Sequence, residues 1–375
     1  MKRRYLYEVD FMRNFFIIGV LSNHIVGICK NIFEVDSPMY LILACIHSSL
    51  HFTRMGFMFM TGLVLFLAYQ NREIKATTFW KKRYFLIGIP YLFWNLIYSL
   101  PLLSSQGFQA TLTHFYSSVI HGDQAYLYYV LVTMQLYLIF PFLLNLMKKY
   151  KPYLKLVWII SLLIQCMITY FIKYKIGNYD TTNWPYLFSH YGIFVGSYQF
   201  YFISGGITAL YYDQLIALIQ KHTNKIKYLL LIMLPTIWLY YFWNRFVLGL
   251  SDKAAKSVHQ PLFILYALVM IIFVLYYGIR WSQNGRKNKQ SMITKWITTG
   301  ARLSFGIYLT QAVGISLVAK FIIPILSNFP SLVIPAIPFL IAMVYGLSFA
   351  ISKICYQTPV LSYVIGRKYQ KKGSI

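Results

Sequence analysis

The chain has 375 residues, of which 58% are hydrophobic and only 12% are charged, and its mean hydropathy is +0.55. These values exclude a soluble globular domain and a disordered chain. A formal net charge of +26 is often a sign of nucleic-acid binding, but here the basic residues cluster beside apolar runs, where they set topology and contact anionic lipid. The composition therefore predicts a polytopic membrane protein with no nucleic-acid partner.

Apolar runs of about 20 residues predict an all-α fold with about ten transmembrane helices. In chain order they lie near 11–29, 52–70, 84–103, 126–147, 154–172, 186–211, 228–248, 260–279, 298–319 and 332–352. Two regions leave alternatives open. Residues 40–51 either extend the second helix or form a separate interfacial helix, and 184–212 is longer than one span requires. We expect one transmembrane domain over 1–352 and a short basic tail over 353–375.

Lysine and arginine are concentrated in alternate connecting segments, which predicts the orientation of the chain. The basic segments are Lys2 to Arg4, Arg72 to Arg83, 148–155, Lys221 to Lys227, Arg280 to Lys295 and the tail from Lys353. The segment 104–125, in contrast, contains no lysine or arginine. By the positive-inside rule, the basic segments and both termini are cytoplasmic, and the protein lies in the cytoplasmic membrane.

Three ionisable residues, Asp10, Arg13 and His24, interrupt the first predicted span. Ionisable side chains at membrane depth are costly and by default indicate function. Arg13 and His24 are eleven residues apart, about three helical turns and roughly 16 Å of rise, and Asp10 lies about one turn before Arg13. All three should share one helix face and form a polar track through the bilayer. Asp10 is the simplest neutralising partner of Arg13, and a purely structural salt bridge is the alternative interpretation.

Other sequence signals are weak. The four cysteines show no CxxC spacing, so they indicate neither a disulfide framework nor a metal cluster. Phosphate-binding glycine loops, GxSxG and HExxH motifs are absent from the sequence. We also find no internal repeat, which disfavours the inverted-repeat transporters.

The stretch VDFMRNFFIIGVLSNH resembles the opening helix of the acyltransferase 3 family of integral membrane acyltransferases, with its Asp, Arg and His at matching spacing. Four further segments are similar to the family in the same order: FMFMTGLVLF at 57–66, FWKKRYFLIGIPYLFW at 79–94, YYVLVTMQLYLIFPFLL at 128–144 and RLSFGIYLTQAV at 302–313. The resemblance covers nearly the whole chain. It implies acyl-CoA as a co-substrate and no bound cofactor.

Within the family, WPYLFSHYGIFVGSYQFYFISGGITALYY and the ending LSYVIGRKYQKK resemble the intercellular-adhesion branch, which acts on surface poly-N-acetylglucosamine. Two positions depart from the family pattern. Leu86 stands where a second arginine often follows Arg83, and Gln311 stands where SFGIYL usually leads to a histidine. Glutamine cannot accept a proton near neutral pH, so a step that needs that histidine must use another group or be missing.

Acyl transfer to a hydroxyl needs a base for the hydroxyl proton and a cation or donors for the developing oxyanion. We expect His24 to be that base, Arg13 to hold an anionic group and Asp10 to balance Arg13. Lys81, Lys82 and Arg83 are the candidate donor-binding residues at the cytoplasmic mouth. For the two lysines, positive-inside flanking charge is the stronger alternative.

His47, His51 and Arg54 follow i, i+4, i+7 spacing and are weaker candidates for acceptor binding. Interfacial packing is the main alternative, and we predict no metal site because a third ligand is not assured. Arg302 is interpreted as a snorkelling flank of its helix.

The sequence thus predicts a membrane O-acyltransferase that moves an acetyl or succinyl group from cytoplasmic acyl-CoA to a cell-surface or exported polysaccharide. Its partners would be the acyl-CoA donor, the glycan acceptor and the lipid bilayer, with a polysaccharide synthase as a candidate. The alternative is a polysaccharide exporter or flippase. The concentration of intramembrane ionisable residues in the first 85 positions favours an enzyme.

Overall fold

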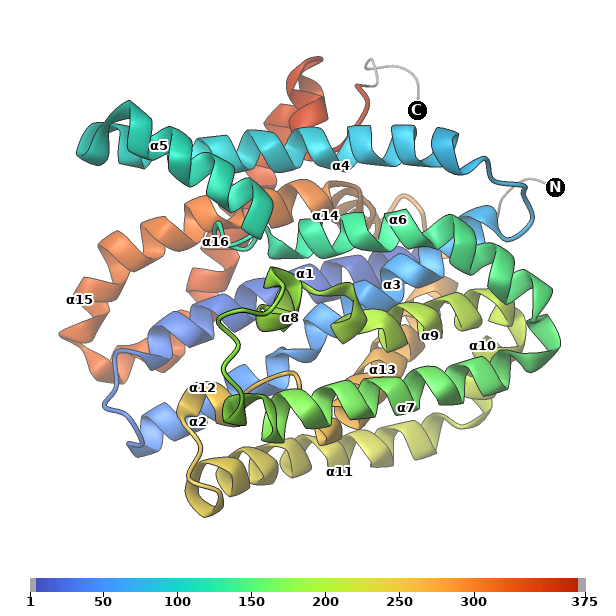
Figure 1. Ribbon diagram of the computed structural model, residues 1–375, viewed down its shortest axis with the longest axis horizontal. Helices are drawn as coiled ribbons and strands as arrows, with labels where there is room; N and C mark the ends of the chain where they lie inside the picture. Colours follow the sequence, from blue (N-terminus) through green and yellow to red (C-terminus); the bar gives the residue numbers. More distant parts are fainter. Residues whose placement is uncertain (1–4, 370–375) are drawn as a thin grey trace.

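The computed structural model describes residues 5–369, and all regular secondary structure in this range is helical (Figure 1). The longer helices are α1 (Tyr7–Lys30), α2 (Pro38–Leu50), α3 (Phe52–Tyr69), α4 (Ala76–Ser99), α5 (Pro101–His121), α6 (Tyr128–Lys149), α7 (Leu154–Tyr174), α9 (Gln199–Leu210), α10 (Tyr212–Lys221), α11 (Thr223–Phe242), α13 (Pro261–Lys287), α14 (Met292–Leu317) and α16 (Val333–Gln357). Short helices include α8 (Tyr186–Ser189), α12 (Asp252–Ala255), α15 (Ile323–Ser327) and η8 (Leu361–Ile365). The all-α prediction is confirmed.

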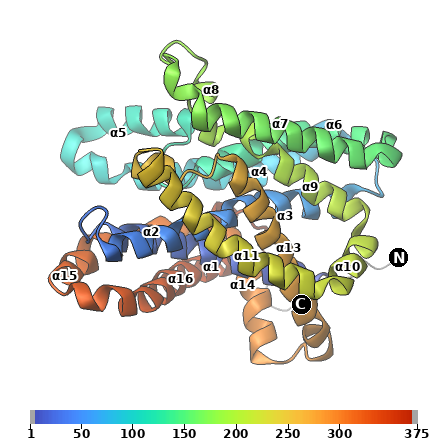
Figure 2. The same cartoon turned by 90° about the horizontal axis from the view of Figure 1, so that it is seen from below.

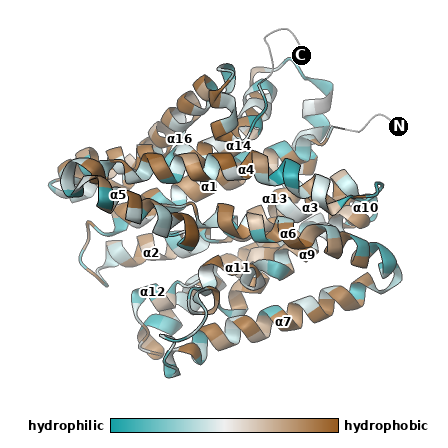
Figure 3. Cartoon of the chain, turned by 45° about the horizontal axis from the view of Figure 1, so that its top comes forward, coloured by the Kyte–Doolittle hydropathy of each residue, from teal (hydrophilic) through white to brown (hydrophobic). Residues whose placement is uncertain are grey.

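Eight helical segments of the described chain are long and apolar enough to cross a membrane, or ten if two sharply bent pairs each count as one span. The bent pairs are α4 with α5, at 110°, and the segment Val195–Leu210 with α10, at 97°. Figure 3 shows apolar residues along most of the long helices, as a lipid environment requires. The prediction of about ten spans is confirmed within this range.

The region 40–51 belongs to a long second span. Helices α2 and α3 together form one 32-residue membrane-crossing segment, Pro38–Tyr69. His51, which lies between them, keeps right-handed helical dihedral angles, so the chain continues without a break. The sequence left this choice open, and the structure selects the extended helix.

The segment 104–125, predicted as a loop, is mostly helical. Pro101 is the first residue of α5 and lacks a backbone N–H, so the chain turns sharply at the end of α4. Gly107 adds a kink with a positive φ of 83°. Between Gly107 and the next glycine, Gly122, neither proline nor glycine interrupts the chain, and α5 extends to His121. The prediction of a plain loop here was wrong.

The span predicted over 186–211 is helical across the membrane only in its second half, as α9. Pro185, Gly192 and Gly196 accompany a series of short turns before it. Glutamine side chains satisfy this irregular backbone: Gln135 Nε2 donates to the Ile193 carbonyl at 2.8 Å, and the buried Gln165 Nε2 donates to the Ser197 carbonyl at 2.9 Å. Non-helical backbone is tolerated near a membrane when protein groups satisfy it in this way.

Helices α3 and α9 pack with their backbones almost in contact. A Cβ atom placed on Gly62 would lie 2.1 Å from the Phe202 carbonyl oxygen, and one on Gly205 would lie 2.0 Å from the Phe59 carbonyl oxygen. Small residues at helix crossings are a recurrent means of membrane-helix association. This contact fixes α3, which carries the candidate site residue Arg54 and directly follows His51.

Helix α1 lies in the interior of the bundle, where it packs against α2, α3, α13, α14 and α16 (Figures 1 and 2). Asn14 ties it to α14, because its amide nitrogen donates to the Ile297 carbonyl oxygen at 2.6 Å. The unusual polar residues of α1 are therefore enclosed mainly by protein rather than lipid.

The two ends of the bundle differ in charge. At one end, which we call the basic end, Lys148 bonds to the carbonyls of Tyr69 and Arg72, and the Tyr211 hydroxyl bonds to the Lys151 carbonyl. Helix α10 lies at the basic end, on the right of Figure 1. Helix α15 lies at the other end, on the left, which we call the opposite end. The contacts thus bring together segments that the sequence predicts to be cytoplasmic.

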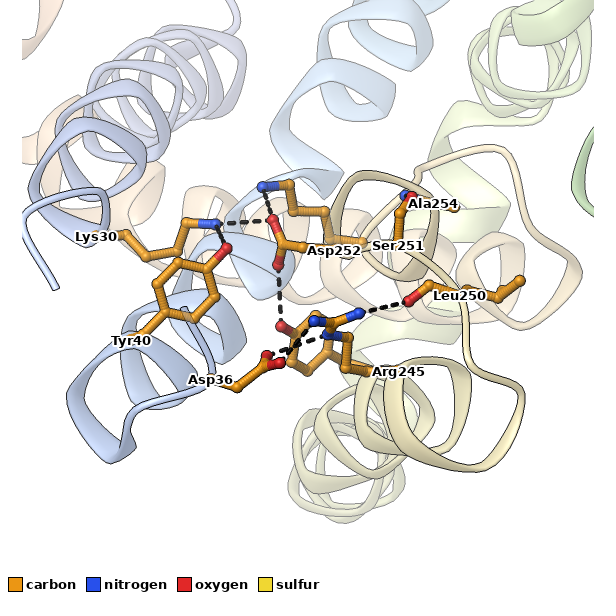
Figure 4. Close-up of polar contacts among 10 residues, drawn as sticks. Lys30, Asp36, Tyr40, Arg245, Leu250, Ser251, Asp252 and Ala254 are labelled. Atoms are coloured by element: carbon orange, nitrogen blue, oxygen red, sulfur yellow. Dashed lines mark hydrogen bonds and ion pairs between the residues drawn. The ribbon is translucent and has the colours of Figure 1, made fainter. Parts of the chain in front are cut away.

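An ionic cluster joins α1, α2, η5 (Trp243–Val247) and α12 at the opposite end (Figure 4). Asp252 pairs with Lys30 at 2.9 Å and with Lys256 at 2.5 Å, and it accepts a hydrogen bond from Tyr241 at 3.0 Å. Burial alone would raise the pKa of Asp252, but hydrogen bonds and charge from the two lysines outweigh it and hold this pKa well below its usual range. The cluster therefore stabilises the fold above about pH 4 and weakens as pH falls below the usual Asp pKa.

We predict that Asp252→Asn destabilises the protein by about 3–5 kcal/mol, because Lys30 is only 2% exposed and would lose its anionic partner. Thermal unfolding in detergent measures the effect. Asp36→Asn is the matched control. The side chains of the Asp36–Arg245 pair are 33% and 22% exposed, so breaking this pair should cost less than leaving the buried Lys30 without an anion. Equal losses of Tm in the two variants would contradict this assignment.

We also predict that the basic end is cytoplasmic. Val35→Cys places a thiol at an exposed site at the opposite end, and Glu73→Cys places one at an exposed site of the basic end. In intact cells, a membrane-impermeant maleimide should label only Val35→Cys above the wild-type background. Inverted vesicles should give the reverse pattern, and labelling of Glu73→Cys in intact cells would overturn the orientation.

Candidate active site

A cavity of about 310 Å³, the basic cavity, is lined by three arginines: Arg13 of α1, Arg83 of α4 and Arg367, which follows η8. Residues of α3, α6 and α14 complete its wall, and none of the described residues lining it is acidic. A cavity lined by arginines and by no acidic side chain among the described residues is suited to an anionic ligand.

The Arg13 guanidinium makes neither a hydrogen bond nor an ion pair with the residues described. Asp10 is buried and accepts a hydrogen bond from the Tyr5 hydroxyl at 2.5 Å, without an Arg13 contact within 4.0 Å. The expected salt bridge between Asp10 and Arg13 is therefore not formed, and the Asp10 carboxylate bonds to the Tyr5 hydroxyl instead. The Arg13 guanidinium thus lines the basic cavity without an ion-paired carboxylate among the described residues.

Arg83 reaches the same cavity from α4. Its guanidinium carbon lies 5.6 Å from the ring centres of Tyr69 and Tyr137 and 5.7 Å from that of Phe79. Arginine stacks well on aromatic faces, which hold the side chain in place. Arg83 Nη2 also donates a hydrogen bond to the Tyr69 hydroxyl at 3.4 Å. Its Nε is buried without a partner among the described residues.

Arg367 comes from the C-terminal segment, which folds back onto the bundle. Trp94 Nε1 donates to the Val364 carbonyl at 2.9 Å, and Gly366 makes a left-handed turn with φ of 71°. A Cβ on Gly366 would lie 2.8 Å from the Leu86 carbonyl oxygen, so glycine is needed at this turn. Arg367 Nη2 then donates to the Arg302 carbonyl at 2.6 Å.

Burial, together with the nearby charges of Arg13 and Arg302, lowers the pKa of Arg367 to about 10. The guanidinium is still protonated at neutral pH. The crowding of like charges means that an anion bound there would relieve repulsion.

The predicted donor residues Lys81 and Lys82 do not line the basic cavity. They line a neighbouring space of about 570 Å³ together with Lys368, while Arg302, Arg367 and Lys368 line another of about 400 Å³. Leu86 borders both of these spaces and the basic cavity. Basic residues thus continue from the surface toward Arg13.

A second cavity, the distal cavity, has a volume of only about 30 Å³ and is lined by His24, His51 and Arg54. The His24 ring stacks on Tyr126, with centres 3.8 Å apart, and the Arg54 guanidinium lies 4.9 Å from the Tyr128 ring centre. His24 makes no hydrogen bond with another described residue. A ring nitrogen is therefore available to a ligand.

His47 is not part of the distal cavity. It packs beside Gly27, where an added Cβ would lie 3.0 Å from His47 Nε2, and its ring centre is 4.5 Å from that of His51. Of the three predicted acceptor residues, the structure brings His51 and Arg54 to His24 and places His47 against α1. Within the described chain, no group of three or more His, Cys, Asp or Glu side chains could hold a metal ion.

The two cavities adjoin. Phe57, Tyr129 and Tyr308 line both of them, with Arg13 on one side of these rings and His24 on the other. Both residues belong to α1, as the eleven-residue spacing predicts. The polar track expected from the sequence corresponds to two chambers with an aromatic boundary.

Gln311 lies in α14, fully buried, and lines neither cavity. Neither of its amide atoms has a partner among the described residues. Since glutamine cannot accept a proton near neutral pH, a base for this site is to be sought at His24 instead.

Sequence reasoning missed Arg367 and interpreted Arg302 as a membrane flank. The only local signal was the Gly-Arg pair after an apolar run in LSYVIGRKYQKK. Tyr126 and Tyr128 were also missed, since aromatic residues are abundant throughout the chain.

The comparisons with known proteins identify one family. The model of the acyltransferase 3 family, described as an acyltransferase domain, matches residues 6–353. No curated protein and no solved structure matches the chain. The matched range includes every cavity-lining residue named above except the C-terminal ones after α16. The chain belongs to the acyltransferase 3 family and is a multi-pass membrane acyltransferase.

Proposed function

We propose that this protein is an O-acyltransferase of the cytoplasmic membrane that moves an acetyl or succinyl group from cytoplasmic acyl-CoA to a cell-surface or exported polysaccharide. The observation that carries the proposal is the alignment of two adjoining chambers, one lined by arginines and the other by His24. No bound cofactor is needed, because the thioester already supplies an activated acyl group.

The donor side of the proposal rests on charge. The phosphates of acyl-CoA are strong partners for arginine, which binds them bidentately. Arg13, Arg83 and Arg367 line the basic cavity, and Lys81, Lys82 and Lys368 lie outside it. Cations arranged from the surface inward would hold the phosphates at the mouth and direct the thioester toward His24.

At His24, the acceptor hydroxyl would attack the thioester carbonyl carbon. A C–O bond forms, the C–S bond breaks, and His24 takes the hydroxyl proton and returns it to the leaving thiolate of CoA. The positive charge of Arg54, in the same chamber, would stabilise the developing oxyanion. Stacking on Tyr126 would keep the imidazole oriented.

On the acceptor side, a cavity of about 30 Å³ admits a sugar hydroxyl rather than a whole ring, and His51 and Arg54 would offer hydrogen bonds to that hydroxyl. The similarity of two segments to the intercellular-adhesion branch makes poly-N-acetylglucosamine our first choice of glycan. A polysaccharide synthase in the same membrane is then a natural partner, since it would deliver the chain to the distal cavity.

The alternative function is polysaccharide export. A translocation route for a glycan needs a continuous path of sugar width, whereas the distal cavity is about 30 Å³ and three aromatic side chains separate it from the basic cavity. This narrowness favours passage of an acyl group over passage of a polymer.

We predict that His24→Ala abolishes the O-linked acyl groups of the surface polysaccharide, because the proton acceptor is lost. Mild alkali releases these groups, and the released acid identifies the donor. His222→Ala is the matched control, since His222 is half-buried and lines neither cavity. Membrane levels of the variants must be equal.

The same experiment separates the two functions. Acyl release that falls in His24→Ala while the amount of exported glycan is unchanged supports acyl transfer. Loss of surface glycan, with normal acyl content in what remains, would overturn acyl transfer in favour of export.

We further predict that Arg367→Gln raises the KM for acyl-CoA about tenfold or more, with a smaller change in kcat, since a charged hydrogen bond to phosphate contributes about 1.5–3 kcal/mol. Acyl transfer by inverted vesicles at varied acyl-CoA concentration measures this. Arg72→Gln makes the same charge change at an exposed site of the basic end that lines neither cavity. An equal rise in both variants would show a general surface-charge effect.

A further inference from the structure

Three aromatic side chains form the boundary between the basic and distal cavities, and we call them the collar: Phe57, Tyr129 and Tyr308. Their rings touch in sequence, with centres 5.8 Å apart between Phe57 and Tyr129 and 5.4 Å apart between Tyr129 and Tyr308, both edge-to-face. The three residues come from α3, α6 and α14. Three separate helices therefore converge at this boundary.

Polar contacts anchor two of the collar rings. The Tyr129 hydroxyl lies 3.2 Å from the Thr61 hydroxyl, and the Tyr308 hydroxyl donates to the Tyr126 carbonyl. Tyr126 in turn stacks on His24. The collar is thus connected to the ring that holds the proposed base, and its geometry is fixed rather than loosely packed.

Phe57 is the apolar member of the collar. Its ring has no polar anchor and packs 5.7 Å from the Phe16 ring of α1. Because it borders both cavities and has no polar function of its own, its size should control the opening without altering the charges at either side.

The two chambers differ about tenfold in volume, 310 Å³ against 30 Å³. A cavity of 30 Å³ has room for about one or two water-sized groups. Beyond the collar there is space for the carbonyl of a short acyl group but not for a chain of several methylenes. One added methylene in a packed pocket changes transfer by about 10- to 200-fold.

We propose that the collar selects the acyl group by length, admitting acetyl to His24 and excluding longer groups, succinyl among them. This inference rests on the proposed acyl transfer and adds the specificity-determining residues. Phe57 is the principal one. The selection acts on the transferred group alone, because the phosphates and pantetheine arm of any acyl-CoA are the same.

The test uses inverted membrane vesicles from the producing cells, with the full-length protein and the polysaccharide made there. Acetyl-, propionyl-, butyryl- and hexanoyl-CoA are supplied separately, and the acids released from the glycan by mild alkali are measured. For the wild type we expect transfer to fall steeply as the acyl chain lengthens. Phe57→Ala should raise the ratio of hexanoyl to acetyl transfer about tenfold or more.

Two further substitutions keep the test decisive if Phe57→Ala fails to fold. Phe57→Leu should shift the ratio in the same direction by less, and Phe57→Trp should restrict transfer further toward acetyl. Phe93→Ala is the matched control, because Phe93 is also half-buried but lines neither cavity. A ratio is insensitive to protein level and to a general loss of stability.

An unchanged ratio in all Phe57 variants, with active wild type, would overturn the collar and leave acyl transfer intact. Wild-type vesicles that transfer no acyl group from any of the donors would instead overturn the proposed function, and the collar's role with it. A shifted ratio in Phe93→Ala would show that packing in general sets the length limit.

Discussion

The arrangement of this protein depends on arginines held inside the bundle without a direct ion pair to the described acidic residues. Arg13 makes no ion pair with the residues described, and the basic cavity has no acidic side chain among those that line it. Charges at membrane depth are costly unless they are paired or solvated. The fold meets this cost with aromatic surroundings for Arg83, a central position for α1 and an open cavity. A bound anion would complete the compensation.

The interior position of α1 follows from the need to keep its polar residues away from lipid. The hydrogen bond from Asn14 to α14 helps to hold α1 there. Helix α3 also packs closely against α1: a Cβ on Gly19 of α1 would lie 2.5 Å from Thr53, and one on Gly56 of α3 would lie 2.4 Å from Phe16. The ionic cluster around Asp252 holds the C-terminal end of α1 in place through Lys30. Rigid support on both sides keeps Arg13 and His24 in fixed positions, which a preorganised site requires.

The sequence was informative where a residue type conflicts with its surroundings. Arg13 and His24 stand out in an apolar run, and the structure places both at adjoining cavities. The contacts around them could not be read from residue spacing. Tyr5 rather than Arg13 binds Asp10, and packing at Gly27 turns His47 away from the distal cavity although its spacing matches that of His51. The return of Arg367 to the cavity likewise depends on a turn at Gly366 and its contact with α4.

The division of the site into two chambers has a further physical consequence. If the proposed transfer joins two compartments, water that reached His24 would compete with the acceptor hydroxyl for the thioester, so the site would need a barrier that an acyl group can occupy and water cannot readily cross. Aromatic rings provide apolar bulk at that barrier, and hydroxyl anchors on Tyr129 and Tyr308 hold it in register with His24. The three collar rings would therefore have two roles. They would limit the passage of water between the two cavities, and they would discriminate between acyl groups of different length.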